Sequence, residues 1–337
     1  MTYRRWLVTG GLGFIGSAFV RGCLQERSDV AITVLDAMTY AANPANVAVV
    51  ADDPRYRFVR GDIADPHAVD EAIGEGVDAI VNFAAETHVD RSILDPEAFI
   101  RTDVMGTHVL LEAVRRHRIQ RFLQVSTDEV YGHVPSGAST EDDPIRPRSP
   151  YAASKAGGDL QVLAYHTTYD LPVLITRGSN TYGPHQYPEK LIPLFVTNLI
   201  DDQTVPVYGD GLQVRDWLHV DDHARGIAHV LEHGRPGHAY NLGGGNSRTN
   251  LAITQRLLEL TGRSFETSVR HVVDRAGHDR RYALDSAKAR RLGWSARVPF
   301  EEGLAQTVAW YRDNEAWWRP IKSGEFRAYY ERQYAHR

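Results

Sequence analysis

The sequence predicts an α/β protein built on a doubly wound parallel sheet of the Rossmann type, with a second, smaller α/β domain. Short apolar runs alternate with helix-length segments through the first half of the chain, which is typical of a parallel sheet covered on both faces. A glycine-rich loop at residues 10–16 directly follows the first of these runs. At 337 residues the chain is long for one compact domain. We therefore expect a first domain at residues 1–178 with a return around 213–238, and a second domain formed mainly by residues 179–337.

Six runs rich in Val, Ile, Leu and Phe predict the strands of the sheet, because Gly, Asp or Pro bounds them. They lie at residues 5–9, 31–36, 57–61, 79–83, 121–126 and 173–177. Helical spacing of apolar residues predicts helices at 15–27, 66–74, 96–116 and 150–169, and later at 220–233, 250–261 and 300–314. From about residue 178 the pattern is irregular: loops with glycine and proline alternate with short apolar stretches such as 191–200.

The composition excludes several classes of partner. A formal net charge of -5 provides no general basic field for nucleic acid. No apolar stretch approaches the roughly 18 to 20 residues that a membrane-spanning helix requires. The single cysteine, Cys23, excludes an internal disulfide, and residues 1–5 lead into a strand without a hydrophobic signal core. We therefore expect a cytoplasmic protein that binds neither nucleic acid nor a membrane.

The glycine-rich loop predicts a dinucleotide site. Gly10, Gly13 and Gly16 let the backbone approach a pyrophosphate, which would sit at the amino end of the helix that begins near Phe14. Asp36 ends the second predicted strand about 20 residues past the last glycine, where an acid accepts hydrogen bonds from the adenosine ribose. An acid there repels a 2′-phosphate, and the two residues after it supply no basic group. NAD is therefore favoured over NADP.

Tyr151 and Lys155 form a candidate base. They lie four residues apart on the predicted helix 150–169 and therefore share one face. A tyrosine with an ordinary pKa of about 10 is a poor base at pH 7, but a neighbouring lysine and a nicotinamide cation both favour the phenolate. This pattern makes Tyr151 a candidate base for a sugar hydroxyl.

Thr127, Asp128 and Glu129 place a hydroxyl and two carboxyl groups side by side at the end of the predicted strand 121–126. This is acid–base equipment beyond what oxidation alone needs. For Asp128 to act as an acid, its pKa must rise well above about 3.9. An apolar closed pocket and the neighbouring Glu129 would both raise it.

The 15 histidines raise the question of a metal site. His219 and His223 lie four residues apart with two aspartates between them, a spacing that could bind zinc on a helix. No third ligand is evident in the sequence, so we expect no metal.

Four motifs carry a resemblance to a known family. They are Thr-Gly-Gly-x-Gly-Phe-Ile-Gly at 9–16, Phe-Ala-Ala-Glu-Thr-His-Val-Asp-Arg-Ser at 83–92, Ser-Thr-Asp-Glu-Val-Tyr-Gly at 126–132 and Tyr-x-x-x-Lys at 151–155. With them the chain resembles the extended short-chain dehydrogenase/reductases and, within these, the dTDP-glucose 4,6-dehydratase family. Segments at 183–193, 208–211, 215–217 and 274–279 extend the resemblance over nearly the whole chain. The Thr-Asp-Glu motif is specific to the dehydratases, whereas the first and last motifs mark only the wider family.

The resemblance implies a dehydration of dTDP-glucose that uses bound NAD: oxidation at C4, loss of water across C5 and C6, and return of the hydride to C6. Such a cycle needs a base for the C4 hydroxyl, a second base at C5 and an acid for the departing C6 hydroxyl. By resemblance, Tyr151, Glu129 and Asp128 fill these roles in that order. Thr127 would hydrogen-bond the C4 oxygen, and Lys155 would tune Tyr151 and the nicotinamide ribose.

The resemblance also implies two sets of binding residues. The expected NAD contacts are Gly10, Gly13, Phe14, Ile15, Gly16, Asp36, Thr39, Asp62, Ile63, Phe83, Ala84, Ala85, Thr102, Tyr151 and Lys155. The expected contacts with the dTDP-sugar are Thr87, Thr127, Asn180, Lys190, Leu191, Pro206, Tyr208, Arg215, Asn250, Arg275 and His278. In the second set, Pro206 and Tyr208 would lie against the base.

The chain departs from the family pattern at two positions. Thr181 stands where the family usually has Asn, near the site of the nicotinamide carboxamide, and Asp103 stands where it usually has Asn in a Thr-Asn-Val segment. The first departure bears on cofactor retention, and neither touches the three catalytic roles.

Two other functions remain open. A nucleotide-sugar 4-epimerase shares the glycine loop, the tyrosine and the lysine, but it lacks the second acid–base pair that Asp128 and Glu129 supply here. A regulator that binds NAD without turnover would be expected to have lost Tyr151 or Lys155, and both are present.

The helices predicted at 96–116 and 150–169 carry apolar residues on more than one face. These include Val104, Met105, Val109, Leu110, Leu160, Val162 and Leu163, beside small residues at 152, 153, 156 and 157. One face must cover the sheet, so a second face remains for another subunit, and the resemblance implies a homodimer that pairs these helices in a four-helix bundle. The alternative is that a loop of the same chain covers this face.

Overall fold

The structure of the protein, a computed structural model, describes residues 3–275, 277–323, 326 and 330. Residues 1, 2 and 276, which belong to segments used above, lie outside the described part.

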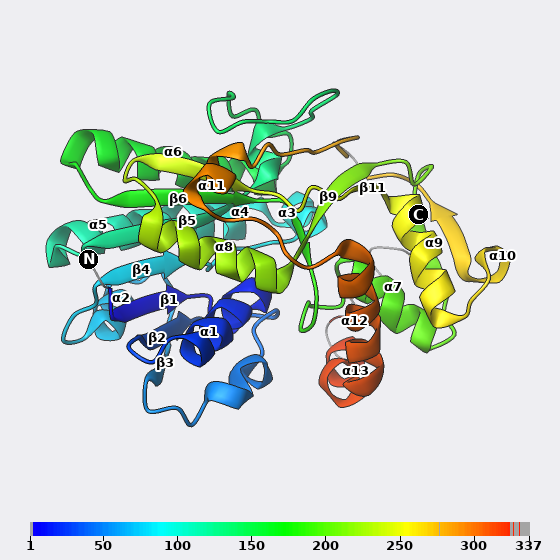
Figure 1. Ribbon diagram of the computed structural model, residues 1–337, viewed down its shortest axis with the longest axis horizontal. Helices are drawn as coiled ribbons and strands as arrows, with labels where there is room; N and C mark the ends of the chain where they lie inside the picture. The colour runs from blue at the N-terminus through cyan, green and yellow to red at the C-terminus, as the bar shows by residue number, and fades with distance from the viewer. Residues whose placement is uncertain (1–2, 276, 324–325, 327–329, 331–337) are drawn as a thin grey trace.

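A seven-stranded parallel sheet forms the larger part of the molecule, in the order β10-β6-β5-β4-β1-β2-β3 (Figure 1). From β1 the chain adds β2 and β3 toward one edge and then β4, β5, β6 and β10 toward the other, so the direction of strand addition reverses at β1, as in doubly wound folds. The strands are β1 (Arg5–Thr9), β2 (Ala31–Asp36), β3 (Tyr56–Arg60), β4 (Ala79–Asn82), β5 (Arg121–Thr127), β6 (Val173–Gly178) and β10 (His238–Leu242). The predicted doubly wound parallel sheet is confirmed.

Helices cover both faces of this sheet. The helical segments of this part are α1 (Phe14–Glu26), η1 (Pro44–Val50), α2 (Pro66–Ile73), α3 (Val89–Leu94), α4 (Pro96–Phe99), η2 (Ile100–Gly106), α5 (Thr107–His117), η3 (Asp128–Tyr131), α6 (Pro150–Tyr169), α8 (Val220–His233) and α11 (Ala287–Leu292). Two of them begin as their sequence suggests: Pro150 follows Ser149, whose side chain accepts from the Ala152 amide at 3.1 Å, and Pro66 follows the capping Asp65.

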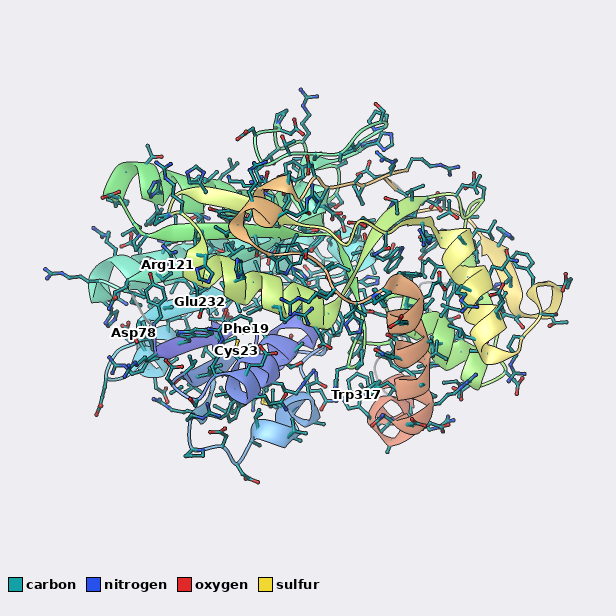
Figure 2. All side chains as sticks on the ribbon, viewed as in Figure 1. Phe19, Cys23, Asp78, Arg121, Glu232 and Trp317 are labelled. Atoms are coloured by element: carbon teal, nitrogen blue, oxygen red, sulfur yellow. The ribbon has the colours of Figure 1, made fainter. Side chains whose placement is uncertain are left out.

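The two faces of the sheet bury different sets of side chains because successive strand residues point to opposite sides. Trp6, Val8 and Val34 pack with α1 and α8 on one face. Leu7, Leu35 and residues of α2, α5 and α6 form the core on the other face. Figure 2 shows Phe19 and Cys23 on α1, and both are buried in the first of these layers. Burial raises the pKa of the Cys23 thiol to about 12, so this cysteine is an inert core residue.

A smaller unit follows β6 and is visible on the right of Figure 1. Its elements are β7 (Asn180–Tyr182), α7 (Leu191–Ile200), β8 (Val205–Tyr208), β9 (Val214–His219), β11 (Ser247–Thr249), α9 (Asn250–Thr261), α10 (Phe265–Ser268), β12 (Val269–Val272), α12 (Phe300–Asp313) and α13 (Glu315–Ser323). Its strands form one sheet of order β11-β9-β7 and a two-stranded sheet of β12 and β8. A separate apolar core includes Phe195, Leu257, Leu304 and Trp318.

Two segments differ from their sequence-based expectation. The helix predicted at 96–116 is broken into α4, the π-helical turn η2 and α5. The wider turn coincides with close packing on neighbouring elements: a Cβ on Gly106 would lie 2.4 Å from Ile63 Cδ1, and one on Gly158 of α6 would lie 2.9 Å from the Asp103 carbonyl oxygen. The apolar stretch 191–200 is the helix α7, and its periodicity is hidden because nearly all of its residues are buried.

Within the described ranges, no helix combines the length and the apolarity needed to cross a bilayer.

Candidate active site

A large cavity lies at the carboxyl end of the main sheet, where the loops that follow β1 to β6 converge. This is the edge at which open parallel sheets hold their ligands. Every residue expected to contact NAD lines this cavity, from Gly10 after β1 and Asp36 at the end of β2 to Tyr151 and Lys155 on α6. The chain therefore brings together side chains from six separate strand ends.

Gly10 and Gly16 of the glycine loop leave no room for a side chain. Gly10 has a φ of +66°, and a Cβ there would lie 2.6 Å from the Ala84 amide nitrogen. A Cβ on Gly16 would lie 2.3 Å from the carbonyl oxygen of Gly10. No side chain caps the amino end of α1, which follows this loop directly. The loop thus offers a backbone cradle and a helix amino terminus to an anionic group.

Asp36 is hydrogen-bonded to the same loop. Its carboxylate accepts hydrogen bonds from the amides of Leu12 at 3.0 Å and Met38 at 2.8 Å. Burial raises the pKa of Asp36, whereas these two amides lower it. The carboxylate therefore joins β2 to the glycine loop at the end of the cavity where Asp62 and Ile63 also lie.

Tyr151 and Lys155 are both buried on the face of α6 that borders the cavity. The Lys155 Nζ donates to the Val125 carbonyl oxygen at 2.8 Å, which fixes the lysine against the end of β5. Burial raises the pKa of Tyr151 well above its ordinary value; the charges of Glu129 and Asp103 raise it further, and a hydrogen bond with Thr127 lowers it. A phenolate at this position therefore needs additional positive charge in the cavity.

Asp128 and Glu129 occupy the short turn η3 that follows β5, and both line the cavity. Thr127 organises this turn, because its Oγ1 accepts from the Glu129 amide at 3.3 Å and donates to Asp128 Oδ1 at 3.2 Å. Burial, and then the charge of Glu129, raise the pKa of Asp128 to about 8. This carboxyl group can therefore hold a proton near neutral pH, as an acid must.

Burial outweighs the nearby cations at Glu129, so the pKa of this carboxyl group is raised. Burial raises the pKa of Glu129, while the charges of Arg275, Arg215 and Lys190 lower it. The Tyr282 hydroxyl lies 3.5 Å from Glu129 Oε2. Glu129 is thus a half-buried carboxyl group that faces cations from the smaller unit.

A second cavity continues from the first into the smaller unit. The two share the lining residues Thr87, Glu129, Asn180, Thr181, Gln186, Glu189 and Lys190. The second cavity is lined by every residue expected to contact the dTDP-sugar except Thr127, which lines the first: Thr87, Asn180, Lys190, Leu191, Pro206, Tyr208, Arg215, Asn250, Arg275 and His278. Of the acid–base residues, Glu129 lines both cavities, whereas Asp128, Tyr151 and Lys155 line the first.

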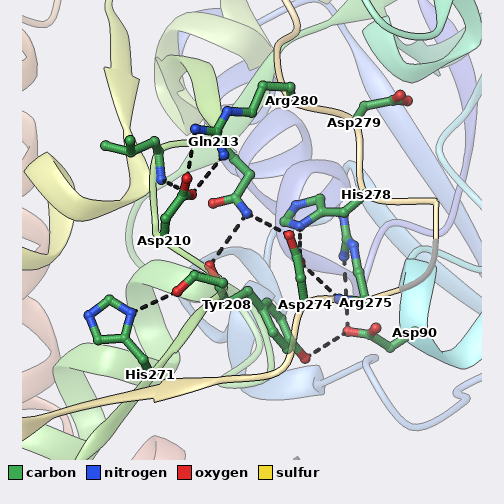
Figure 3. Close-up of polar contacts among 12 residues, drawn as sticks. Asp90, Tyr208, Asp210, Gln213, His271, Asp274, Arg275, His278, Asp279 and Arg280 are labelled. Atoms are coloured by element: carbon green, nitrogen blue, oxygen red, sulfur yellow. Dashed lines mark hydrogen bonds and ion pairs between the residues drawn. The ribbon is translucent and has the colours of Figure 1, made fainter.

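The far end of the second cavity is built from polar contacts between distant segments (Figure 3). The Tyr208 hydroxyl donates to Asp90 Oδ2 at 3.4 Å, and the Arg275 Nη1 lies 4.0 Å from the same oxygen. The His278 Nδ1 lies 2.6 Å from Asp274 Oδ1. Burial, and then the charge of Arg275, lower the pKa of His278 to about 4, so this histidine is neutral at pH 7 and donates to Asp274.

The sequence did not predict several residues that lie in or beside the site. The Tyr40 hydroxyl donates to Glu189 Oε1 at 2.8 Å, and the Arg91 Nε donates to Glu189 Oε2 at 2.9 Å. Glu189, which lines both cavities, thus joins the loop after β2 to helix α3. The Tyr282 hydroxyl, besides facing Glu129, donates to Asp279 Oδ2 at 2.8 Å. Glu189 and Asp279 stand inside segments that carried the resemblance, whereas Tyr40 and Tyr282 have no local sequence signal.

The histidine pair lies beside the first cavity. His223 is buried, and its Nδ1 lies 2.8 Å from Thr181 Oγ1, while the His219 Nδ1 accepts from the Asp221 amide at 3.3 Å. Among the residues that the structure describes, no group of three or more His, Cys, Asp or Glu side chains is arranged to hold a metal ion. The other departure from the family pattern, Asp103, accepts a hydrogen bond from Ser154 Oγ at 2.6 Å.

Comparison with known proteins places this site in a family. A family model described as GDP-mannose 4,6-dehydratase matches residues 7–307. The chain belongs to that family. It is 57% identical to a dTDP-glucose 4,6-dehydratase of Streptomyces niveus over 324 residues, which cover 95% of this chain and 96% of the relative. This confirms the resemblance to the dTDP-glucose 4,6-dehydratases.

Solved structures of proteins similar to this chain have the same fold. A dTDP-glucose 4,6-dehydratase of Streptomyces venezuelae, solved with NAD bound, superposes with a TM-score of 0.92 at 55% identity, covering 94% of this chain and all (100%) of that one. A UDP-glucose 4-epimerase of Thermus thermophilus, also solved with NAD, gives a TM-score of 0.85 at 31% identity, covering 92% and 99%. The fold is therefore shared by dehydratases and epimerases, and the residues of the site must decide between them.

Proposed function

We propose that this protein is a dTDP-glucose 4,6-dehydratase that uses bound NAD. The observation that carries the proposal is the meeting of two acid–base sets at one point: Tyr151 with Lys155 on α6, and Asp128 with Glu129 on η3. The identity of 57% to a dTDP-glucose 4,6-dehydratase over nearly the whole chain supports it.

The first cavity fits NAD. We propose that the backbone of Gly10, Gly13 and Gly16 binds the pyrophosphate and that Asp36 accepts from the adenosine ribose, because Gly10 and Gly16 have no space for a side chain and the carboxylate lies beside the loop. The remaining expected contacts line the walls. Accepting a hydride from C4 and returning it at C6 is the chemistry that NAD supplies when bound. The oxidised nicotinamide also carries the positive charge that a Tyr151 phenolate needs.

Oxidation is assigned to Tyr151, Thr127 and Lys155. We propose that Tyr151 takes the proton of the C4 hydroxyl while Thr127 hydrogen-bonds the same oxygen. Lys155, anchored by the Val125 carbonyl, holds the nicotinamide ribose and favours the phenolate through its charge.

Elimination is assigned to Asp128 and Glu129. The 4-ketone acidifies the C5 hydrogen, Glu129 removes it as a proton, and Asp128 delivers a proton to the departing C6 hydroxyl. Asp128 is suited to this step because burial and its neighbour raise its pKa to about 8. The hydride then returns to C6 while Glu129 gives its proton back to C5, which completes the 4-keto-6-deoxy sugar.

The second cavity is assigned to the nucleotide diphosphate. Lys190, Arg215 and Arg275 line the cavity, with Arg215 buried and the other two half-buried, and each lowers the pKa of Glu129 through its charge. Asn180 and Asn250 would complete the diphosphate site, while Pro206 and Tyr208 would pack on the base. Several cations that line one cavity favour an anionic ligand.

Redox balance tests this proposal. Incubation with dTDP-glucose should form a 4-keto-6-deoxy sugar, measured by the absorbance it develops in alkali, and turnover should leave no net NADH because the hydride returns to the same molecule. An epimerase would give neither net NADH nor the alkali-sensitive product. Stoichiometric accumulation of NADH would instead identify a plain dehydrogenase, and the absence of any turnover would favour an NAD-binding regulator.

We also propose the two-domain division expected from the sequence. The chain leaves the main sheet at Gly178, the end of β6, and returns to it with α8 and β10, whereas β9 pairs with β7 and β11 outside it. The larger unit would bind NAD and the smaller one the nucleotide-sugar. A cytoplasmic location is likewise a proposal, and it rests on the sequence.

We further propose a homodimer formed by α5, α6 and the turn η2. Leu110 and Val162 are fully buried against the sheet, whereas Met105 and Leu160 expose 52% and 55% of their surface. Ile100 is exposed as well. Gly157 packs against Val104 of the same chain and is therefore not available to a partner. The exposed apolar residues of this face are the surface that a second subunit can cover.

Leu160→Glu should dissociate the dimer, because it places a charge in the centre of the apolar face. Light scattering at micromolar concentration should give about twice 37.8 kDa for the native chain and one chain mass for the variant. Val49→Glu is the matched control, since Val49 is a similarly exposed apolar residue on η1. A native mass near 37.8 kDa would contradict the proposal.

A further inference from the structure

A buried polar network lies directly behind the acid–base turn. It consists of Tyr131 at the end of η3, Asp159 on α6, Arg177 on β6 and Asn241 on β10, and we call it the Tyr131 network. Each of the four residues is at most 5% exposed. None of them lines the cavities, and no step proposed above uses them.

The donors and acceptors available to Asn241 and Tyr131 determine the direction of each hydrogen bond between them. The Asn241 Nδ2 donates to the carbonyl oxygens of Ser139 at 3.0 Å and Asp285 at 3.3 Å, so its Oδ1 must be the acceptor toward Tyr131. The Tyr131 hydroxyl donates to this Oδ1 at 2.8 Å and accepts from the Arg177 Nη1 at 2.8 Å. One hydroxyl is thus held on two sides, which fixes the position of the turn that carries it.

The cation in this network is itself anchored. The Arg177 Nε donates to Asp159 Oδ2 at 2.9 Å, and the two side chains are only 3% and 0% exposed. They lie on the sheet face that α5 and α6 cover, among apolar side chains such as Val162 and Ile175. Removing two charges from water is costly, and apolar residues of similar volume often serve stability equally well. We therefore look for a role of the Arg177–Asp159 ion pair other than stability.

The network joins the two elements that carry the chemistry. Tyr131 stands two residues after Glu129, and Asp159 stands one helical turn after Lys155. The same turn also packs on α6 through Val130, Tyr131 and Ala156, which form a small apolar cluster. By contrast, Lys155 has its own anchor at the Val125 carbonyl and does not depend on this network.

We propose that Tyr131 is a positioning residue that keeps Asp128 and Glu129 correctly placed beside the sugar for loss of water. Arg177, Asp159 and Asn241 hold Tyr131 in its position. The inference rests on the proposed function and adds residues to it that contact neither substrate nor cofactor. Since the oxidation residues are held separately on α6, the network serves elimination more than oxidation.

Tyr131→Phe tests this role because it removes one hydroxyl and keeps the ring packing. We expect kcat with dTDP-glucose to fall on the order of 10- to 100-fold, the scale of a small misplacement of catalytic groups, with KM nearly unchanged. Because oxidation continues while elimination slows, reduced nicotinamide should accumulate during turnover, measured by its absorbance. A residue with a merely structural role would not shift the balance between the two steps.

Tyr240→Phe is the matched control. Tyr240 precedes Asn241 on β10, is buried on the opposite face of the sheet, and its hydroxyl accepts one hydrogen bond from the Arg235 amide at 2.8 Å. This variant should lose melting temperature without accumulation of reduced nicotinamide. The proposal is overturned if Tyr131→Phe keeps the native kcat, or if both steps slow equally. If the native chain and Tyr240→Phe do not turn over dTDP-glucose at all, the proposed function fails, which is a separate result.

A second variant keeps the proposal testable should Tyr131→Phe fold poorly. In Arg177→Met with Asp159→Leu, apolar residues replace the buried ion pair, an exchange that often leaves stability unchanged or raises it. We expect a stable protein in which reduced nicotinamide accumulates, since Tyr131 loses one of its two partners. A stable double variant with native kcat would show that the ion pair does not position the turn.

Discussion

Glu129→Gln should slow the loss of water by about 10² to 10⁴, while oxidation at C4 continues and reduced nicotinamide builds up on the enzyme. The reason is that glutamine preserves the shape of the buried side chain but cannot accept the C5 proton. The measurement is a single-turnover experiment with dTDP-glucose that follows nicotinamide absorbance and the alkali-sensitive product separately. Turnover at the native rate would show that Glu129 is not the second base.

Asp128→Asn should slow the same step, and it adds a dependence on pH. The pKa of Asp128 is raised to about 8, first by burial and then by the charge of Glu129, so the acid form is present below about pH 8 and is lost above it. Elimination by the native chain should therefore decline as pH rises through about 8, and this decline should be absent from the slow residual rate of the variant. A variant with the same alkaline decline would assign that decline to another group.

Tyr151→Phe should suppress both halves of the reaction, because elimination requires the 4-ketone that oxidation forms. The expected loss in the rate of nicotinamide reduction is about 10² to 10⁴. Stopped-flow absorbance after mixing with dTDP-glucose measures this rate directly. We attribute this loss in rate to the missing phenolate and not to a missing cofactor. The NAD content of the variant should therefore equal that of the native chain.

The control for this variant is again Tyr240→Phe, which removes a hydroxyl far from the cavities. Reduction of nicotinamide at the native rate in Tyr151→Phe would transfer the role of first base to another residue. The Tyr282 hydroxyl, 3.5 Å from Glu129, would then be the next candidate to test.

Local sequence was sufficient to predict the main sheet and the glycine loop. Strand boundaries at 5–9 and 31–36 agree with β1 and β2, because the apolar runs of buried parallel strands end abruptly at polar or glycine residues. The helix 150–169 agrees with α6, since Ser149 and Pro150 mark its start. Such signals are encoded within a few residues and do not depend on what the chain does elsewhere.

Other features could not be predicted locally. The break of the helix 96–116 at η2 coincides with contacts that Gly158 and Ile63 make from other elements. The helix α7 is buried on nearly all sides, so it shows no periodicity in its sequence. In both cases the tertiary surroundings, and not the segment itself, decided the conformation.

The same distinction holds for the candidate site. The sequence by itself determined which groups are present: a glycine loop, a tyrosine and lysine one turn apart on a helix, and adjacent carboxyl groups after a strand. Only the tertiary structure decided how those groups ionise, because the pKa of a buried carboxyl group depends on desolvation and on charges that arrive from distant segments. Asp128 becomes an acid through burial and its neighbour, while the charges of Arg215 and Arg275 from the smaller unit partly oppose the burial that raises the pKa of Glu129. These cations lie far along the chain from the turn that they tune, and only folding brings them to it.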